Sequence, residues 1–241
     1  ILILSNKEIE MPVSNFNIKS RLPFGDGQSF GKIGPYEILE GTFEFSVDPN
    51  NKHNESINDL ELATTNHHGQ VEFSSDFVIL SPKDPNKGNG KIFFDILNRG
   101  RKTAIVSFND PERPVSPSDP IDPGNGFLMR YGYIIVFCGW QPDVPPIAGL
   151  LGMQIPDALD ENGDQVVGKI MCQFQCNQPT QRFMLSHNGH TPHPPYDINE
   201  NEAVLTVRNL PEDKPYTIDR SEWSFVDEAN GNKSTPEYIL M

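Results

Sequence analysis

Two apolar runs near the middle of the chain predict buried β-strands. Residues 91–98 and 133–140 are rich in β-branched and aromatic side chains and lack the alternation of a half-buried strand. Between them, residues 126–131 form a short apolar segment closed by Gly132, which predicts a turn of helix with a glycine at its end. Two buried strands that flank a helix indicate a crossover in which the strands run parallel.

The segments before this unit alternate like strands that bury one face. In residues 36–47 the side chains of Phe43, Phe45 and Val47 fall on the same face. Looser forms of the same pattern occur in residues 8–24, 57–63 and 71–80. We therefore expect an antiparallel meander ahead of the crossover.

After residue 141 the apolar segments become shorter and are separated by turn-forming residues. Residues 166–176 and 202–207 predict strands of a second β-rich segment, and residues 238–241 predict the start of a further strand. Prolines interrupt residues 108–123 and 177–199, so both segments predict long loops.

The net charge of the chain narrows the classes of binding partner, whereas its cysteine content does not identify a cellular compartment. The 241 residues carry a formal net charge of −14, from 19 Lys and Arg against 33 Asp and Glu. This balance argues against a nucleic-acid partner and against an anionic membrane surface. No apolar stretch approaches the roughly 20 residues of a membrane-spanning helix. Three cysteines form no disulfide pattern, so the composition leaves the cellular compartment open.

Several short motifs resemble those of one protein family. They include Gly-Pro-Tyr-Glu at 34–37, Val-Glu-Phe-Ser-Ser-Asp-Phe at 71–77, Asn-Arg-Gly at 98–100, the glycine-bounded segment 124–132, and Gly-Trp-Gln-Pro-Asp-Val-Pro-Pro at 139–146. Together they are similar to the alpha/beta hydrolase domain proteins, a poorly characterised family. The similarity spans nearly the whole chain, and its last two motifs are the most specific.

The resemblance implies a partial α/β hydrolase-like fold that is β-rich, with a mixed sheet, one strand–helix–strand crossover and a β-rich insertion. Residues 1–143 would hold the amino-terminal strands and the first core strands. Residues 144–234 would form the insertion, and residues 235–241 would begin the next core strand. We therefore expect a partial chain that lacks the half bearing the nucleophile.

The function that the resemblance implies is hydrolysis of a carboxylic ester. The serine nucleophile, the acid and the histidine would all lie downstream of this chain, so we expect no catalytic residue within it, no cofactor, and no activity from the chain alone. The expected partners are a small-molecule ester as substrate and the missing carboxy-terminal half of the same protein.

Residues 27–31 (Gly-Gln-Ser-Phe-Gly) match the Gly-x-Ser-x-Gly pattern of a hydrolase nucleophile. The pattern works where a strand delivers the serine into a sharp turn that a helix follows. Here Gly34 and Pro35 prevent a helix after Ser29. We interpret the segment as a glycine-rich turn between strands.

Asn98, Arg99 and Gly100 end the strand predicted at residues 91–98. In a hydrolase the loop after the third core strand supplies one backbone N–H of the oxyanion hole, and glycine allows close approach there. On the resemblance these three residues are candidates for that loop, with Arg99 meeting an anionic substrate group. The alternative is a strand-ending turn in which Arg99 pairs with a nearby carboxylate.

His187, His190 and His193 are weak candidates for a zinc site, because three imidazoles recur at three-residue spacing. Neighbouring prolines and Gly189 prevent a helix that would align them, so a solvated loop without metal is the expectation. A metal-dependent hydrolase built on this loop is one alternative function.

A second alternative is a non-catalytic β-sandwich that binds carbohydrate or another small ligand. In that case the two central apolar runs would pair antiparallel. Parallel pairing with a helix at residues 126–131 favours the hydrolase instead.

Overall fold

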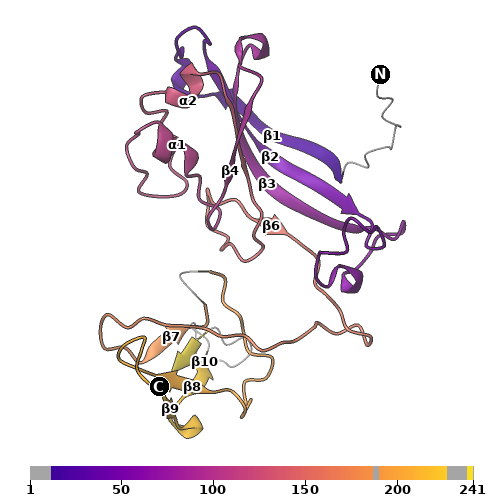
Figure 1. Ribbon diagram of the computed structural model, residues 1–241, viewed down its shortest axis with the longest axis vertical. Coiled ribbons are helices and arrows are strands. Elements are labelled where there is room, and N and C mark those ends of the chain that lie inside the picture. The colour runs from indigo at the N-terminus through magenta and orange to yellow at the C-terminus, as the bar shows by residue number, and fades with distance from the viewer. Residues whose placement is uncertain (1–11, 187–189, 227–237, 241) are drawn as a thin grey trace. The chain divides into compact units, whose positions relative to one another are not determined.

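The computed structural model describes residues 12–186, 190–226 and 238–240, the last three by their backbone alone (Figure 1). The chain divides into two units, Ile1–Val166 and Val167–Met241. Among the described helices, none has the length and apolar character that a membrane crossing requires.

A six-stranded mixed sheet forms the first unit (Figure 1). Its strands run in the order β1 (Val13–Pro23), β2 (Tyr36–Val47), β3 (Val71–Pro82), β5 (Ile134–Cys138) and β4 (Ile92–Ile96), and β6 (Met153–Gln154) adds to β3. All neighbours pair antiparallel except β4 and β5, which are parallel, with Ile92 opposite Ile134. The predicted parallel pairing of the two central runs is therefore confirmed.

Two short helices follow β4 and precede β5 in the chain, and both lie on the same side of the sheet (Figure 1). They are α1 (Ala104–Phe108) and α2 (Phe127–Arg130). The helix predicted at residues 126–131 is confirmed as α2, whereas α1 was not predicted. The core joins both helices to the sheet and contains Leu80, Leu97, Ala104, Ile105, Leu128, Met129, Ile135 and Phe137.

The expected α/β hydrolase fold is wrong for this chain. Strands make up 32% of the structure and helices 10%, with α1 and α2 the only α-helices in the described residues. Such a fold needs many helices, because each parallel connection crosses over a face of the sheet. Here only β4 and β5 are parallel, and the antiparallel neighbours β1, β2 and β3 are joined by turns and loops.

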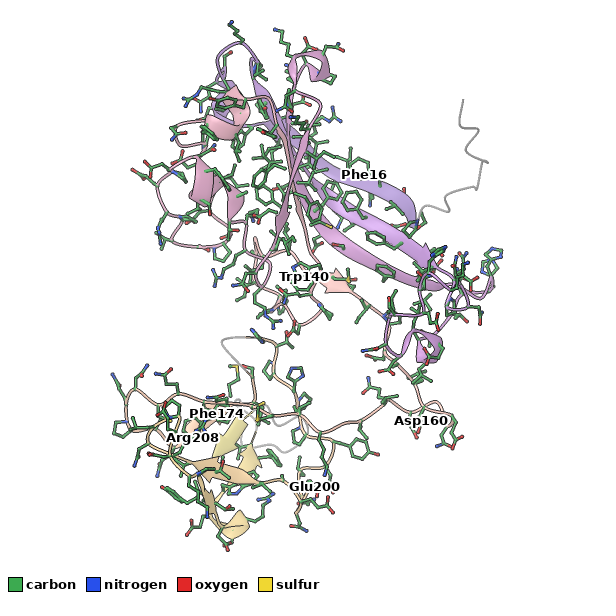
Figure 2. The ribbon with its side chains drawn as sticks, in the orientation of Figure 1. Phe16, Trp140, Asp160, Phe174, Glu200 and Arg208 are labelled. Atoms are coloured by element: carbon green, nitrogen blue, oxygen red, sulfur yellow. The ribbon has the colours of Figure 1, made fainter. Side chains whose placement is uncertain are left out.

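The sheet face opposite the helices carries aromatic rings, among them Phe16 (Figure 2). The ring centroids of Phe16 and Phe43 lie 5.2 Å apart, and those of Phe43 and Phe77 lie 4.6 Å apart. On the edge strand β4 the side chains on this face are largely exposed: Ile92 64%, Phe94 55% and Ile96 74%. The prediction that residues 91–98 form a buried strand is therefore wrong for this face.

The second unit holds two small antiparallel sheets. One has the order β10 (Ser224–Val226), β11 (Tyr238–Leu240) and β7 (Arg182–Met184), and the other pairs β8 (Leu205–Val207) with β9 (Tyr216–Ile218). Leu185, Trp223 and Phe225 form its core. The strand predicted at residues 238–241 thus pairs within this unit, because its neighbours β10 and β7 lie there, and does not join the main sheet.

Three further expectations change with the structure. The expected boundary between residues 143 and 144 moves to Val166, because β6 pairs with β3 and Leu151 enters the first core. The strand predicted at 166–176 does not form, since Ile170 and Met171 are exposed and the segment pairs with no described strand. The strand predicted at 57–63 is replaced by the 3₁₀ turn Leu60–Leu62.

The remaining 3₁₀ turns lie in loops of both units. They are Gly25–Gly27, Pro85–Lys87 and Arg220–Glu222.

Candidate functional site

The chain turns back sharply at the carboxyl end of β4. Arg99 and Gly100 both have positive φ angles, 53° and 74°, as in hairpin turns that need two left-handed residues. The backbone N–H of Arg101 closes the turn by donating to the Asn98 carbonyl over 3.2 Å. The three predicted loop residues therefore form one tight turn.

Residues that follow β5 hold this turn in place. The Arg99 backbone N–H donates to Gln141 Oε1 over 2.8 Å, and the Arg99 guanidinium forms an ion pair with Asp143. Trp140 Nε1 donates to the Leu97 carbonyl over 2.6 Å. Because parallel strands end at the same edge of the sheet, the segment after β5 reaches the loop after β4. The Gly-Trp-Gln-Pro-Asp motif thus has a structural explanation.

Gly100 is buried in the turn, where its position excludes a side chain. A Cβ added there would lie 2.7 Å from Leu151 N, and the Gly100 carbonyl accepts a hydrogen bond from that N–H over 3.1 Å. In the described part of the chain, the Gly100 N–H has no acceptor, whereas the N–H groups of Arg99 and Arg101 are both bonded. Buried backbone donors normally have a partner, so this N–H is an unsatisfied donor beside Arg101, although Gly100 itself is not among the residues that line the cavity described below.

Asp95 fixes the far end of the same loop. Its side chain is 8% exposed and points from β4 toward the helices. Its carboxylate accepts hydrogen bonds from the backbone N–H groups of Thr103 and Ala104, each over 2.8 Å. Asp95 was not among the residues predicted from the sequence, although a single acid inside an apolar run is a signal that could have identified it.

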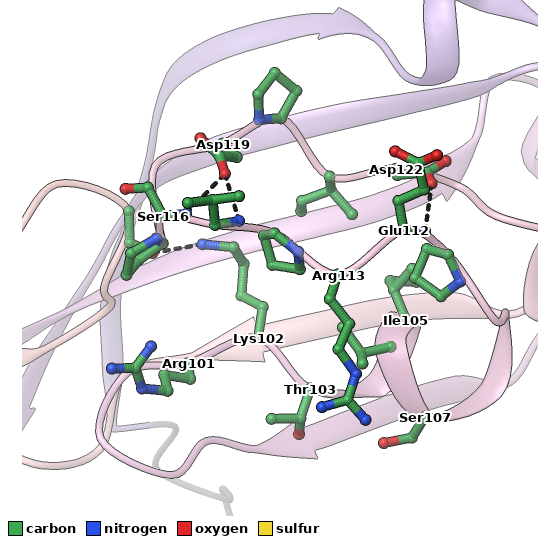
Figure 3. A pocket seen from close by; sticks show the side chains of 18 residues that line it. Arg101, Lys102, Thr103, Ile105, Ser107, Glu112, Arg113, Ser116, Asp119 and Asp122 are labelled. Atoms are coloured by element: carbon green, nitrogen blue, oxygen red, sulfur yellow. Dashed lines mark hydrogen bonds between the residues drawn. The ribbon is translucent and has the colours of Figure 1, made fainter.

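A cavity of about 340 Å³ lies between α1 and the proline-rich loop of residues 111–122 (Figure 3). This volume is in the range of small-molecule sites. Ile105, Val106 and Ile121 contribute apolar walls, and Arg101 enters the lining directly after the turn. The long loop predicted at residues 108–123 therefore has a role as the wall of a pocket.

Lys102 adjoins Arg101 in this lining. Its Nζ donates a hydrogen bond to the carbonyl of Gly149. Burial lowers the pKa of Lys102, and the charge of Glu40 acts in the opposite direction. The ammonium is thus tied to the backbone at one side of the pocket.

Of the other predicted candidates, Ser29, His190 and His193 are not among the residues that line this pocket. Ser29 forms an isolated bridge with Pro35 and is followed by turn residues, with no helix after it. His187 lies outside the described residues. His193 belongs to the second unit, where its backbone N–H donates to the Leu185 carbonyl over 2.8 Å. Within the described ranges, no group of three His, Cys, Asp or Glu side chains is placed to hold a metal.

The arrangement can bind a small molecule and stabilise negative charge on it. A free N–H in a fixed turn is a donor for an oxyanion, and the neighbouring cations favour an anionic ligand. The described lining of the pocket contains no histidine and no cysteine, so the pocket offers no histidine base and no thiol.

Comparison with known proteins adds no further constraint. No family model, no curated protein and no solved structure matches this chain. The resemblance to the alpha/beta hydrolase domain proteins therefore stays an expectation, and a functional assignment rests on the geometry of the turn and the pocket.

Proposed function

We propose that this chain is the oxyanion-binding and substrate-binding part of a carboxylic-ester hydrolase, with the nucleophile, acid and histidine outside these 241 residues. The proposal rests on the turn at Arg99 and Gly100. That turn lies at the carboxyl end of a parallel strand and borders the pocket through Arg101. Its buried Gly100 N–H has no acceptor in the described chain.

The chemistry needs a rigid donor at this point. Attack on an ester carbonyl places negative charge on its oxygen, and a preorganised N–H stabilises that charge without rearrangement. One such donor contributes about 2.7–4 kcal/mol to the transition state. Gln141, Asp143 and Asp95 supply the rigidity, because they hold both ends of the loop.

The exposed face of β4 is where we propose that polypeptide carrying the catalytic groups packs. β4 is an edge strand, and its Ile92, Phe94 and Ile96 side chains are more than half exposed on the face away from α1 and α2. Parallel strands are normally covered on both faces. The partner we propose is therefore polypeptide outside this chain, the expected carboxy-terminal half of the same protein, packed along β4.

A β-sandwich binding module is the less favoured alternative. It required the two central runs to pair antiparallel, whereas β4 and β5 pair parallel with two helices between them.

Two assays test the proposal. The first uses the 241-residue chain with p-nitrophenyl acetate and butyrate. We expect no turnover above the uncatalysed rate and no effect of Ser29→Ala. Robust turnover that Ser29→Ala abolishes would contradict a nucleophile outside the chain.

The second assay uses the protein from the complete reading frame, which we expect to hydrolyse these esters. Gly100→Ala should displace the turn against Leu151 and lower kcat by about 100-fold or more, with a small effect on KM. Gly163→Ala is the matched control, because Gly163 also has a positive φ, 84°, but no atom within 4 Å of an added Cβ. Absence of esterase activity, or an unchanged kcat in Gly100→Ala, would refute the proposal.

A further inference from the structure

The pocket beside the turn gathers cations in a strongly acidic chain. Arg101, Lys102 and Arg113 all line it, although the net charge is −14. Among the described residues, ion pairs join Arg21 to Glu37 and Arg99 to Asp143. Within that part of the chain, neither Arg101 nor Arg113 has a carboxylate within 4.0 Å. Both guanidinium groups are therefore free to bind an anion.

Among the described residues, the acids of the pocket form no ion pair with these arginines. Asp119 and Asp122 each accept two backbone N–H groups of the loop, over 2.7–2.9 Å, and so hold the loop in shape. Glu112 lies beside Asp122, across the pocket from Arg101 (Figure 3). The carboxylates thus occupy the side of the pocket formed by the proline-rich loop.

Arg99 is not free to bind an anion, although the sequence analysis made it the candidate for meeting an anionic substrate group. Its guanidinium is paired with Asp143, and its backbone N–H is bonded to Gln141. The strand-ending turn with a paired Arg99, which was the alternative interpretation, is what the structure contains. Arg101, two positions further, enters the pocket lining instead.

The apolar residues and the formal charge of the lining indicate what the rest of the ligand is. Ile105, Val106 and Ile121 offer an apolar surface next to the two arginines. The three cations and the three carboxylates of the lining balance in formal charge, which favours a singly charged anion over a doubly charged phosphate. A guanidinium binds a carboxylate through two parallel hydrogen bonds.

Building on the proposed ester-hydrolase function, we propose that its substrate is an ester that also carries a carboxylate, held by Arg101 and Arg113. A monoester of a short dicarboxylic acid fits this description. The apolar walls formed by Ile105, Val106 and Ile121 contact its methylene chain.

Binding to the 241-residue chain tests the inference without requiring hydrolysis. Monoethyl glutarate and ethyl pentanoate have chains of the same length and differ in one carboxylate. Each is titrated while the methyl resonances of Ile105, Val106 and Ile121 are followed by NMR. We expect monoethyl glutarate to bind about tenfold more tightly than ethyl pentanoate, and added NaCl to weaken only the former.

Charge-removing variants identify the groups responsible. Arg101→Gln and Arg113→Gln should each weaken binding of monoethyl glutarate by about tenfold and leave ethyl pentanoate unchanged. Arg208→Gln is the matched control, because Arg208 lies in the second unit and donates to the Pro211 carbonyl. Should one variant unfold, the comparison of the two esters and the salt dependence still decide the outcome.

Equal affinity for the two esters, no binding of either, or arginine variants that bind like the wild type would overturn the inference. The ester-hydrolase proposal is judged separately, by turnover of p-nitrophenyl esters in the complete protein. Tight, arginine-dependent binding without any esterase activity would support the carboxylate site and refute the hydrolase.

Discussion

The carboxylate of Asp95 accepts hydrogen bonds from both the backbone N–H and the hydroxyl of Thr103, over 2.8 and 3.1 Å. Asp95 lies within β4, and Thr103 immediately precedes α1. The contact therefore closes the loop that contains the Gly100 turn and sets where α1 begins. A buried carboxylate thereby positions a loop that it does not itself belong to.

Asp95→Ala should lower the free energy of unfolding of the first unit by about 2–3 kcal/mol, because it leaves the buried Ala104 N–H and the neighbouring Thr103 N–H without acceptors. Urea unfolding can be followed through Trp140 in a Trp223→Phe background, since the chain has two tryptophans. Asp84→Ala is the control: Asp84 is exposed, accepts one N–H from Asn86, and should cost about 1 kcal/mol or less. Equal effects of the two substitutions would contradict the anchoring role of Asp95.

Asn109 connects the two helices and is fully buried. Its Nδ2 donates to the Pro123 carbonyl over 2.9 Å, and its Oδ1 accepts the Leu128 N–H over 3.1 Å. Asn109→Ala leaves the Leu128 N–H unpaired and removes one of the two hydrogen bonds that the Pro123 carbonyl accepts, so it should destabilise the first unit by about 2–4 kcal/mol. Asn86→Ala, at an exposed position, should change stability by less than about 0.5 kcal/mol in the same urea assay.

Gly139 packs against the backbone of Gly152 at the end of β5. A Cβ added at Gly139 would lie 2.2 Å from the Gly152 carbonyl oxygen, so Gly139→Ala forces the two segments apart. We expect a loss of about 3 kcal/mol or more, or failure to fold. Gly168→Ala meets no atom within 4 Å and should be neutral. Circular dichroism and the urea midpoint measure both, and a stable Gly139→Ala protein would contradict the close approach.

Tyr36 makes the stability of the first unit decrease as the pH rises above about 10. Its buried hydroxyl donates to the carbonyls of Met129 and Tyr133, and burial raises its pKa above the ordinary 10.0. Above pH 10 the unfolded chain loses this proton while the folded chain keeps it, so stability present below pH 10 declines as the pH rises. Tyr36→Phe should be less stable by about 1–2 kcal/mol at neutral pH and lack this part of the alkaline decline.

The measurement is the free energy of unfolding of both proteins from pH 8 to pH 11. Tyr131→Phe removes a hydroxyl from a side chain that is 60% exposed and should retain the wild-type pH dependence. Parallel curves for the wild type and Tyr36→Phe would exclude the buried hydroxyl as the source.

Much of the main sheet could be predicted because side-chain alternation is a local property of an extended backbone. Residues 36–47 match β2 at both ends, and the crossover with α2 follows from two apolar runs and a closing glycine. The five residues of α1 escaped prediction, since so short a helix shows no period. Its start depends on Asp95, which lies nine residues before Ala104 in the chain.

The position of the candidate turn could be predicted from the sequence, but the hydrogen bonds and the ion pair of its residues could not. Asn98, Arg99 and Gly100 were identified by the end of an apolar run followed by glycine. Whether Arg99 would face a substrate or an acid depended on Asp143, which the parallel pairing of β4 and β5 brings beside it. The arginines that line the pocket, Arg101 and Arg113, carry no pattern that distinguishes them from other charged residues.

Alternation, prolines and glycines along the chain thus determined where most strands of the first unit run and where loops interrupt them. Tertiary structure alone decided which strands are neighbours, which face of β4 stays open, and which arginines remain unpaired. The physical reason is range: backbone extension and turn formation are set by adjacent residues, whereas burial and ion pairing depend on residues tens of positions away.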